Sequence, residues 1–203
     1  MSVFNVSKAI DSSIGNHSKL TDNIFTCKTF SKEYCGDIVS ACEELSDQFV
    51  ISKPDQPYAV DHLPLEYLGA SFCHKFNEIL DKYLINSIVS FYGMKQRPSY
   101  SLLRPYIARY SQDNLSCIGE HPDLSTFSFI IKLNEDYSGG ELVFPKSDFI
   151  CYNSKVEVGE SIIFPGLHLY PHFTKEVSSG TKYSLVGFLI YSGFLNAECC
   201  NHF

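Results

Sequence analysis

The sequence predicts an α+β fold in which N-terminal helices support a β-sandwich or jelly-roll barrel. Apolar residues recur at helical spacing over residues 31–93, whereas short runs rich in β-branched and aromatic residues alternate with turn signals over residues 99–191. A chain of 203 residues is long enough to bury a sizeable core. It shows no internal repeat, low-complexity tract or linker. We therefore expect one domain over residues 24–203, after a loosely ordered segment over residues 1–23.

The first predicted helix follows a short strand within Asn23–Thr29. Ser31 precedes the helix, and its hydroxyl suits the position that caps a helix N-terminus. The apolar side chains of this helix fall three and four residues apart and are Tyr34, Cys35, Ile38, Val39, Cys42 and Leu45. Such spacing predicts one buried face.

A second helix is expected to begin near Pro64, because proline suits a first helical position. Its apolar stripe consists of Leu65, Leu68, Phe72, Phe76, Leu80 and Tyr83. The pattern continues to Gly93, with a break expected near Asn86. Two prolines between the helices mark residues 51–62 as a loop.

Eight or nine short strands are expected in the second half of the chain. The candidate strands are Ser101–Tyr110, Ser116–Asp123, Thr126–Leu133, Gly140–Phe144, Phe149–Tyr152, Ser154–Val158, Ser161–Phe164, Tyr170–Val177 and Tyr183–Tyr191. Turn residues separate them, at residues 134–139, 145–148, 159–160 and 178–180. Because the strands follow the helices instead of alternating with them, the fold class is α+β.

Charge and cysteine content exclude several classes of protein. The net charge of −7 is opposite to that of most proteins held on duplex nucleic acid, so nucleic acid is not the expected partner. The eight cysteines form no C-x-x-C pair, and no apolar run is long enough to cross a membrane. Without a signal-peptide pattern, we expect a cytoplasmic protein (host cytoplasm if viral) with reduced thiols, including exposed Cys199 and Cys200.

The most informative residues are His121, Asp123 and a later histidine. Residues two apart on a strand project to the same face, so His121 and Asp123 can both ligate one metal ion. A third ligand would come from a distant strand, and His168 and His172 are the candidates. Two histidines and one carboxylate with open positions are the ligand set of non-haem Fe(II) oxygenases.

Further segments follow in a characteristic order. They are Leu133-Asn134, Gly139-Gly140-Glu141, Val158-Gly159 before Phe164-Pro165, and His172 followed by Val177, Gly180 and Lys182. With His121-x-Asp123, this ordered set resembles the prolyl 4-hydroxylase-like branch of the Fe(II)/2-oxoglutarate-dependent dioxygenases. The likeness extends from about Tyr106 to Leu189, and the compact chain is similar to the small bacterial and bacteriophage members.

The resemblance implies a double-stranded β-helix, the jelly-roll barrel that cupins share. It implies that His121, Asp123 and His172 bind Fe(II), because the residues after His172 match the family's spacing and those after His168 do not. Lys182 would pair with the distal carboxylate of 2-oxoglutarate, and Tyr110 would contact the same group. O₂ would be the second cosubstrate, and ascorbate is a candidate reductant.

One departure from the family pattern concerns the residues expected to line the 2-oxoglutarate pocket. Many relatives carry tyrosine three residues before His-x-Asp, where this chain has Ile118. The segment from Tyr110 to His121 is also slightly longer than in the family. Both differences predict an altered wall near the cosubstrate.

The activity implied is hydroxylation of an unactivated C–H bond, first of a peptidyl proline, with succinate and CO₂ as coproducts. Relatives also act on other side chains, free amino acids and small metabolites. Two alternatives remain open: a nucleic-acid demethylase with the same metal ligands, and a cupin-like binding module without turnover. Arg97, Arg104 and Arg109 either line a substrate groove or are solvated cations at strand edges.

Overall fold

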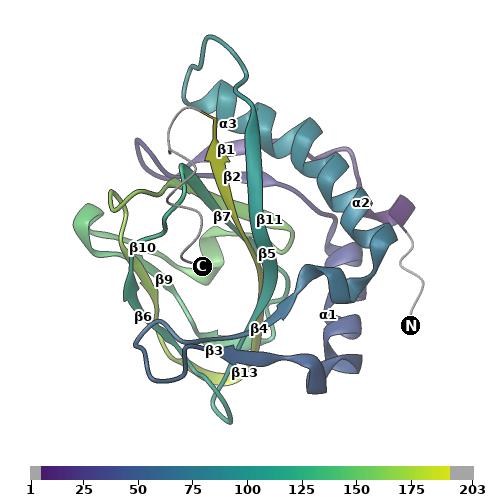
Figure 1. Cartoon of the computed structure of the whole chain (residues 1–203), viewed down its shortest axis with the longest axis vertical. Coiled ribbons are helices and arrows are strands. Elements are labelled where there is room, and N and C mark those ends of the chain that lie inside the picture. The colour runs from purple at the N-terminus through teal and green to yellow at the C-terminus, as the bar shows by residue number, and fades with distance from the viewer. Residues whose placement is uncertain (1–5, 193–203) are drawn as a thin grey trace.

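The structure is a computed structural model that describes residues 6–192 and consists mostly of β-strands (Figure 1). The strands are β1 (His17–Lys19), β2 (Phe25–Lys28), β3 (Val50–Ser52), β4 (Val60–Pro64), β5 (Tyr100–Ser111), β6 (Ile118–His121), β7 (Phe127–Lys132), β8 (Tyr137–Gly139), β9 (Leu142–Phe144), β10 (Phe149–Cys151), β11 (Glu160–Pro165), β12 (His172–Thr174) and β13 (Val177–Tyr191). The α-helices are α1 (Lys32–Glu44), α2 (Ala70–Ile79) and α3 (Ile85–Phe91). No helix within residues 6–192 is long and apolar enough to span a membrane.

The strands form two sheets. The larger has the order β1-β2-β11-β7-β13-β5-β4-β3, with β8 paired to β13, and the smaller has the order β10-β9-β12-β6. All neighbouring strands whose pairing is resolved are antiparallel. The small sheet faces the large one, and the helices lie on the opposite side of the large sheet (Figure 1).

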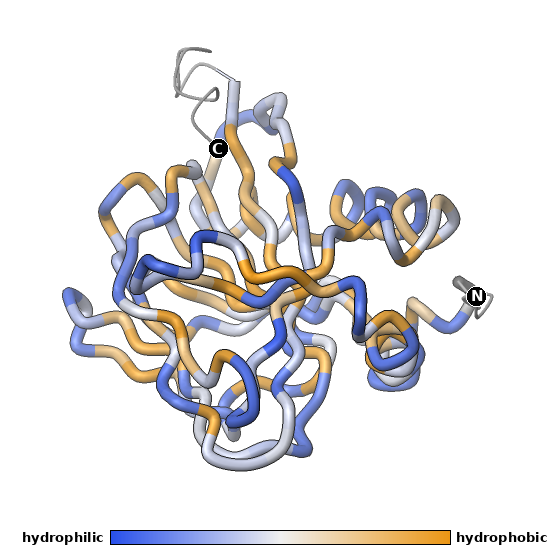
Figure 2. The backbone as a smooth tube through the Cα atoms, turned by 60° about the horizontal axis from the view of Figure 1, so that its bottom comes forward, coloured by the Kyte–Doolittle hydropathy of each residue, from blue (hydrophilic) through white to orange (hydrophobic). Residues whose placement is uncertain are grey.

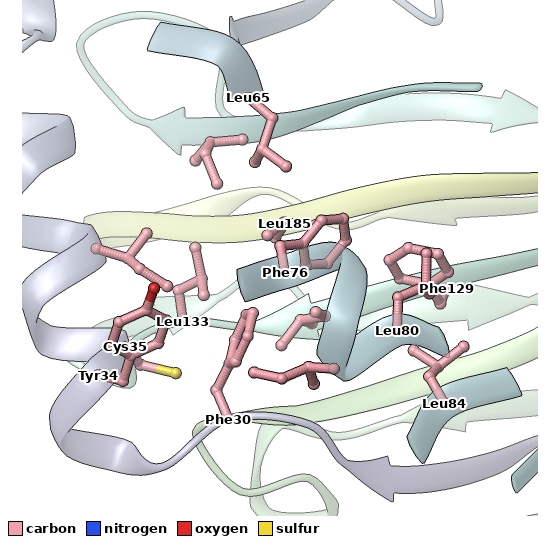
Figure 3. Close-up of a cluster of buried hydrophobic side chains, with 14 of the residues drawn as sticks. Phe30, Tyr34, Cys35, Leu65, Phe76, Leu80, Leu84, Phe129, Leu133 and Leu185 are labelled. Carbon is pink, nitrogen blue, oxygen red and sulfur yellow. The ribbon is translucent and has the colours of Figure 1, made fainter. Parts of the chain in front are cut away.

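The main core lies between the helices and the large sheet. Helix residues such as Tyr34, Phe76 and Leu80 pack with the strand residues Phe129 and Leu185, all fully buried or nearly so (Figure 3). On β13, alternate residues face this core, so the intervening residues face the small sheet. Figure 2 shows hydrophobic stretches along the central strands, whereas hydrophobic and hydrophilic residues alternate in the helices.

The helical predictions were confirmed in part. Helix α1 begins after Ser31, whose side chain accepts a hydrogen bond from the backbone N–H of Tyr34 at 3.1 Å. The second helix begins at Ala70, after a 3₁₀ turn, and a π-helical segment at Leu80–Leu84 joins it to α3. The break predicted near Asn86 is therefore wrong, because the helical geometry changes one turn earlier.

Several strand predictions were also wrong. The predicted loop 51–62 contains most of β3 and part of β4, which pair with each other at the sheet edge. Residues 154–158 form no strand, and residues 178–180 lie within β13 instead of ending a strand. In the N-terminal segment expected to be loosely ordered, β1 pairs with β2.

Candidate metal centre

Two histidines face each other across the small sheet. His121 ends β6, His172 begins β12, and they are direct cross-strand partners with ring centroids 4.6 Å apart. The Nδ1 atom of His121 lies 2.8 Å from the carbonyl oxygen of Gly119, and that of His172 lies 3.1 Å from the carbonyl oxygen of Tyr170. Since a carbonyl only accepts, each Nδ1 carries the proton and each Nε2 offers a lone pair.

Asp123 completes the cluster. It lies just beyond the end of β6, so the expectation that it shares a strand with His121 is wrong. Its two carboxylate oxygens lie 3.8 Å from Nε2 of His121 and 3.8 Å from Nε2 of His172. One ligand atom from each of the three residues lies within 4.8 Å of the others. Because metal bonds to such atoms are about 2.0–2.2 Å long, atoms 3.8 Å apart can share one ion.

The cluster is more buried at His172 than at His121. The side chain of His172 is 4% exposed and that of His121 is 20% exposed. Phe144 and Phe164 contact the His172 ring, with centroid distances of 5.6 and 4.7 Å. Burial lowers the pKa of His172 below its ordinary value, although Asp123 opposes this shift. The neutral ring is the form that binds a metal, so this donor set fits Fe(II).

His168, the other candidate for the third ligand, does not belong to this cluster. It lies between β11 and β12 with a φ of 63°. Its backbone carbonyl accepts a hydrogen bond from Lys146 at 3.3 Å. Among the described residues, the group that can hold a metal contains His172 in its place.

A cavity between the two sheets contains the predicted cosubstrate residues. Its volume is about 40 Å³, and Lys182 and Tyr110 both line it. The two residues are cross-strand partners on β13 and β5, and Lys182 Nζ lies 5.6 Å from the centroid of the Tyr110 ring. Thr174, two residues after His172 on β12, also lines the cavity and connects it to the strand that carries His172.

Lys182 is a buried cation without an acidic partner in this cavity. Its Nζ donates a hydrogen bond to the carbonyl oxygen of Gly140 at 2.7 Å, and no Asp or Glu is among the residues that line the cavity. Burial lowers the pKa of Lys182 to about 8. A buried ammonium group of this kind fits the distal carboxylate of 2-oxoglutarate.

The sequence prediction missed Ser184, which lines the same cavity two residues after Lys182. Its hydroxyl is buried and has no hydrogen-bond partner among the described residues. The alternation of strand residues could have indicated it, because residues 182 and 184 share a face of β13.

The arginines considered for a substrate groove have other environments. Arg97 forms an ion pair with Asp81. Arg109 Nε lies 2.6 Å from Oδ2 of the buried Asp61, and its guanidinium stacks over the Phe49 ring. Arg104 has a φ of 30° where β5 and β13 change register. Cys199 and Cys200 lie outside the described residues.

Comparisons with known proteins support an oxygenase fold. No protein-family model matches the chain. It is 33% identical over 106 residues to the multifunctional procollagen lysine hydroxylase and glycosyltransferase of Caenorhabditis elegans, a match that covers 49% of this chain. The chain spans only 14% of the length of that relative.

Three solved structures have a similar fold. The Pseudomonas putida prolyl-4-hydroxylase has a TM-score of 0.64 and 14% identity, with 84% of this chain and 94% of that chain covered. A 2OG-Fe(II) oxygenase family protein from Burkholderia pseudomallei has a TM-score of 0.61 and 18% identity, with 83% and 85% covered. A Trichoplax adhaerens prolyl hydroxylase in complex with a hypoxia inducible factor peptide has a TM-score of 0.61 and 14% identity, with 84% of each chain covered. The resemblance predicted from the sequence is therefore confirmed: the chain has the fold of the Fe(II)/2-oxoglutarate-dependent oxygenases.

Proposed function

We propose that the chain is an Fe(II)- and 2-oxoglutarate-dependent dioxygenase that hydroxylates an unactivated C–H bond in a peptide, with succinate and CO₂ as coproducts. One observation carries this proposal: a cluster of two histidines and one aspartate lies beside a cavity that holds a buried lysine. We also infer that the two facing sheets are the walls of a double-stranded β-helix. The similarity to solved oxygenases supports both statements.

In this proposal His121, Asp123 and His172 hold Fe(II). The hydrogen bonds from Nδ1 to Gly119 and Tyr170 fix each imidazole ring with Nε2 toward the ion. Asp123 contributes the one negative charge of the ligand set. Bound together, Fe(II) and 2-oxoglutarate supply the O₂-dependent oxidising chemistry that no protein side chain provides.

Lys182 binds the distal carboxylate of 2-oxoglutarate. The carboxylate offsets the desolvation of the ammonium group, and Tyr110 forms the adjacent wall. Two other cations of the chain, Arg109 and Lys175, are less suitable as anchors. Arg109 is already paired with Asp61, and Lys175 is exposed.

Aromatic rings exclude water from the buried side of the centre. Phe144 and Phe164 are fully buried against His172. The more exposed His121 indicates the side from which a substrate can approach. A substrate bound there would shield the remaining side from water, which favours productive oxidation over side reactions.

The first candidate substrate is a peptidyl proline. Two solved structures of similar fold are prolyl hydroxylases, and one of them is in complex with a peptide. Peptidyl lysine is the second candidate, because the Caenorhabditis elegans relative is named as a procollagen lysine hydroxylase. A nucleic-acid substrate is disfavoured by the net charge of −7.

Substrate-dependent succinate release tests the proposal. The protein with Fe(II), 2-oxoglutarate and ascorbate would be incubated with peptides that differ only in carrying proline, lysine or alanine at one position, and with a methylated oligonucleotide. We expect the proline peptide to stimulate succinate release and to gain one oxygen atom, whereas Asp123→Ala should abolish both. Stimulation by the lysine peptide alone would mean that the enzyme hydroxylates lysine instead of proline. Stimulation by the oligonucleotide, or no turnover with any substrate, would refute the proposal.

A further inference from the structure

A second lysine side chain enters the cosubstrate cavity. Lys132 on β7 is the direct cross-strand partner of Ser184 on β13, so the two side chains lie on the same face of the large sheet. Lys182 lies two residues before Ser184 and shares that face. Lys132 and Lys182 are therefore diagonal neighbours, and both line the cavity together with Ser184.

The ammonium groups of both lysines donate hydrogen bonds only to uncharged backbone carbonyl groups. Lys132 Nζ donates hydrogen bonds to the carbonyl oxygens of Asn153 at 2.9 Å and Val156 at 3.0 Å. Lys182 Nζ donates to the carbonyl oxygen of Gly140. Among the ion pairs formed by residues 6–192, none involves either lysine. Burial lowers the pKa of both, and two like charges on neighbouring strands repel each other. Two cations without a carboxylate partner thus line one cavity.

Ser184, which is opposite Lys132 and two residues from Lys182, has a hydroxyl without a partner. Ser184 is 2% exposed, and its Oγ forms no hydrogen bond with any described residue. A buried polar group without a partner destabilises the folded protein, so this hydroxyl is available to a ligand. A hydroxyl and two ammonium groups around one cavity are the donors that a carboxylate requires.

We propose that Lys132 is a second cation for the distal carboxylate of 2-oxoglutarate. In this arrangement the carboxylate lies between Lys132 and Lys182 and accepts a hydrogen bond from the hydroxyl of Ser184. An ammonium group has three hydrogens, and the backbone carbonyls take two of those on Lys132, so one remains for the ligand. The inference rests on the proposed function. Its consequence is strong selection for 2-oxo acids that carry a distal carboxylate.

Calorimetric titration of the Mn(II)-loaded protein tests this role without turnover. Lys132→Met removes the charge and keeps the length of the side chain. Lys155→Met is the matched control, because Lys155 is exposed on the adjacent turn and does not line the cavity. The ligands would be 2-oxoglutarate and oxalate, which chelates a metal but has no distal carboxylate. We expect Lys132→Met to weaken 2-oxoglutarate binding by about tenfold or more, since hydrogen bonds to charged groups are among the stronger ones. Oxalate binding should be unchanged, and Lys155→Met should alter neither ligand.

The outcomes separate this inference from the proposed function. If Lys132→Met binds 2-oxoglutarate as the wild type does, the second cation is refuted and the proposed function stands. Equal losses for oxalate and 2-oxoglutarate would mean that Lys132 only holds the segment of Asn153 and Val156 in place, which also overturns the inference. If the wild-type protein binds oxalate but not 2-oxoglutarate, both proposals fail. Lys132→Arg, which keeps the charge, should retain most of the affinity.

Discussion

At the scale of single residues, Lys182 links the protonation state of the cavity to ligand binding. Burial lowers its pKa from 10.5 to about 8, so the ammonium form is already costly in the folded protein. A carboxylate beside Lys182 would raise this pKa again. Below about pH 8 the side chain is already charged when the ligand arrives, whereas above pH 8 binding must be accompanied by uptake of a proton.

This linkage predicts the pH dependence of cosubstrate affinity. The dissociation constant for 2-oxoglutarate should be nearly constant below about pH 8 and should rise above it, by at most about tenfold per pH unit. Lys182→Arg should lose less affinity over this range than the wild type, because a guanidinium group stays charged. Calorimetry with Mn(II)-loaded protein at several pH values measures both. The same loss of affinity in Lys182→Arg would contradict the assignment.

The grouping of two histidines and one aspartate could be predicted from the sequence, whereas part of the cavity could not. His121, Asp123 and His172 belong to a local motif and an ordered series of segments, which are visible in the chain itself. Lys132 and Ser184 become neighbours only through the register of β7 against β13, which no local pattern specifies.

At the scale of elements, the turn between β8 and β9 positions the acceptor for Lys182. Gly139 and Gly140 have φ values of 77° and 70°, in the left-handed region that favours glycine. A Cβ atom on Gly139 would lie 2.1 Å from the carbonyl oxygen of Glu176. The carbonyl of Gly140 accepts the hydrogen bond from Lys182, so this turn connects backbone conformation to the cavity.

Gly139→Ala should therefore destabilise the protein and weaken cosubstrate binding. The unfavourable φ alone costs roughly 1–2 kcal/mol, and the clash with Glu176 adds to it. The free energy of unfolding in urea measures the effect. Gly36→Ala is the control, because Gly36 lies within α1 with no atom near its added Cβ and should gain about 0.5–1 kcal/mol. Equal stability of Gly139→Ala and the wild type would show that the turn is not constrained as described.

Elements that depend on distant pairing were the ones that sequence analysis missed. β3 and β4 lie in a polar stretch with two prolines, and their pairing with each other and with β5 provides their stability. Residues 178–180 read as a turn because of Ser-Ser-Gly, yet they continue β13 through a register shift opposite β8. By contrast, Ser31 capped its helix as predicted, because capping depends on neighbouring residues only.

At the scale of the whole molecule, the two faces of the large sheet have different roles. Its outer face packs against the helices in the main core, while its inner face and the small sheet enclose the cavity. His121 and His172 lie on the small sheet. The strand-rich second half of the chain was predictable from its alternating pattern, whereas most of β1, β3 and β4, in the first half, was not. Which strands join which sheet was not predictable either, since that depends on contacts between residues far apart in the sequence.

Anaerobic titration of the protein with Fe(II) and then 2-oxoglutarate, followed by visible absorption, tests the proposed metal centre most directly. We expect a weak charge-transfer band that appears only when both are present, because the 2-oxo acid chelates the bound metal. Asp123→Ala should lose the band together with Fe(II) binding, and Lys182→Met should bind Fe(II) normally but require far more 2-oxoglutarate. A wild-type protein that gives no band, or a band that Asp123→Ala retains in full, would contradict the assignment of this site.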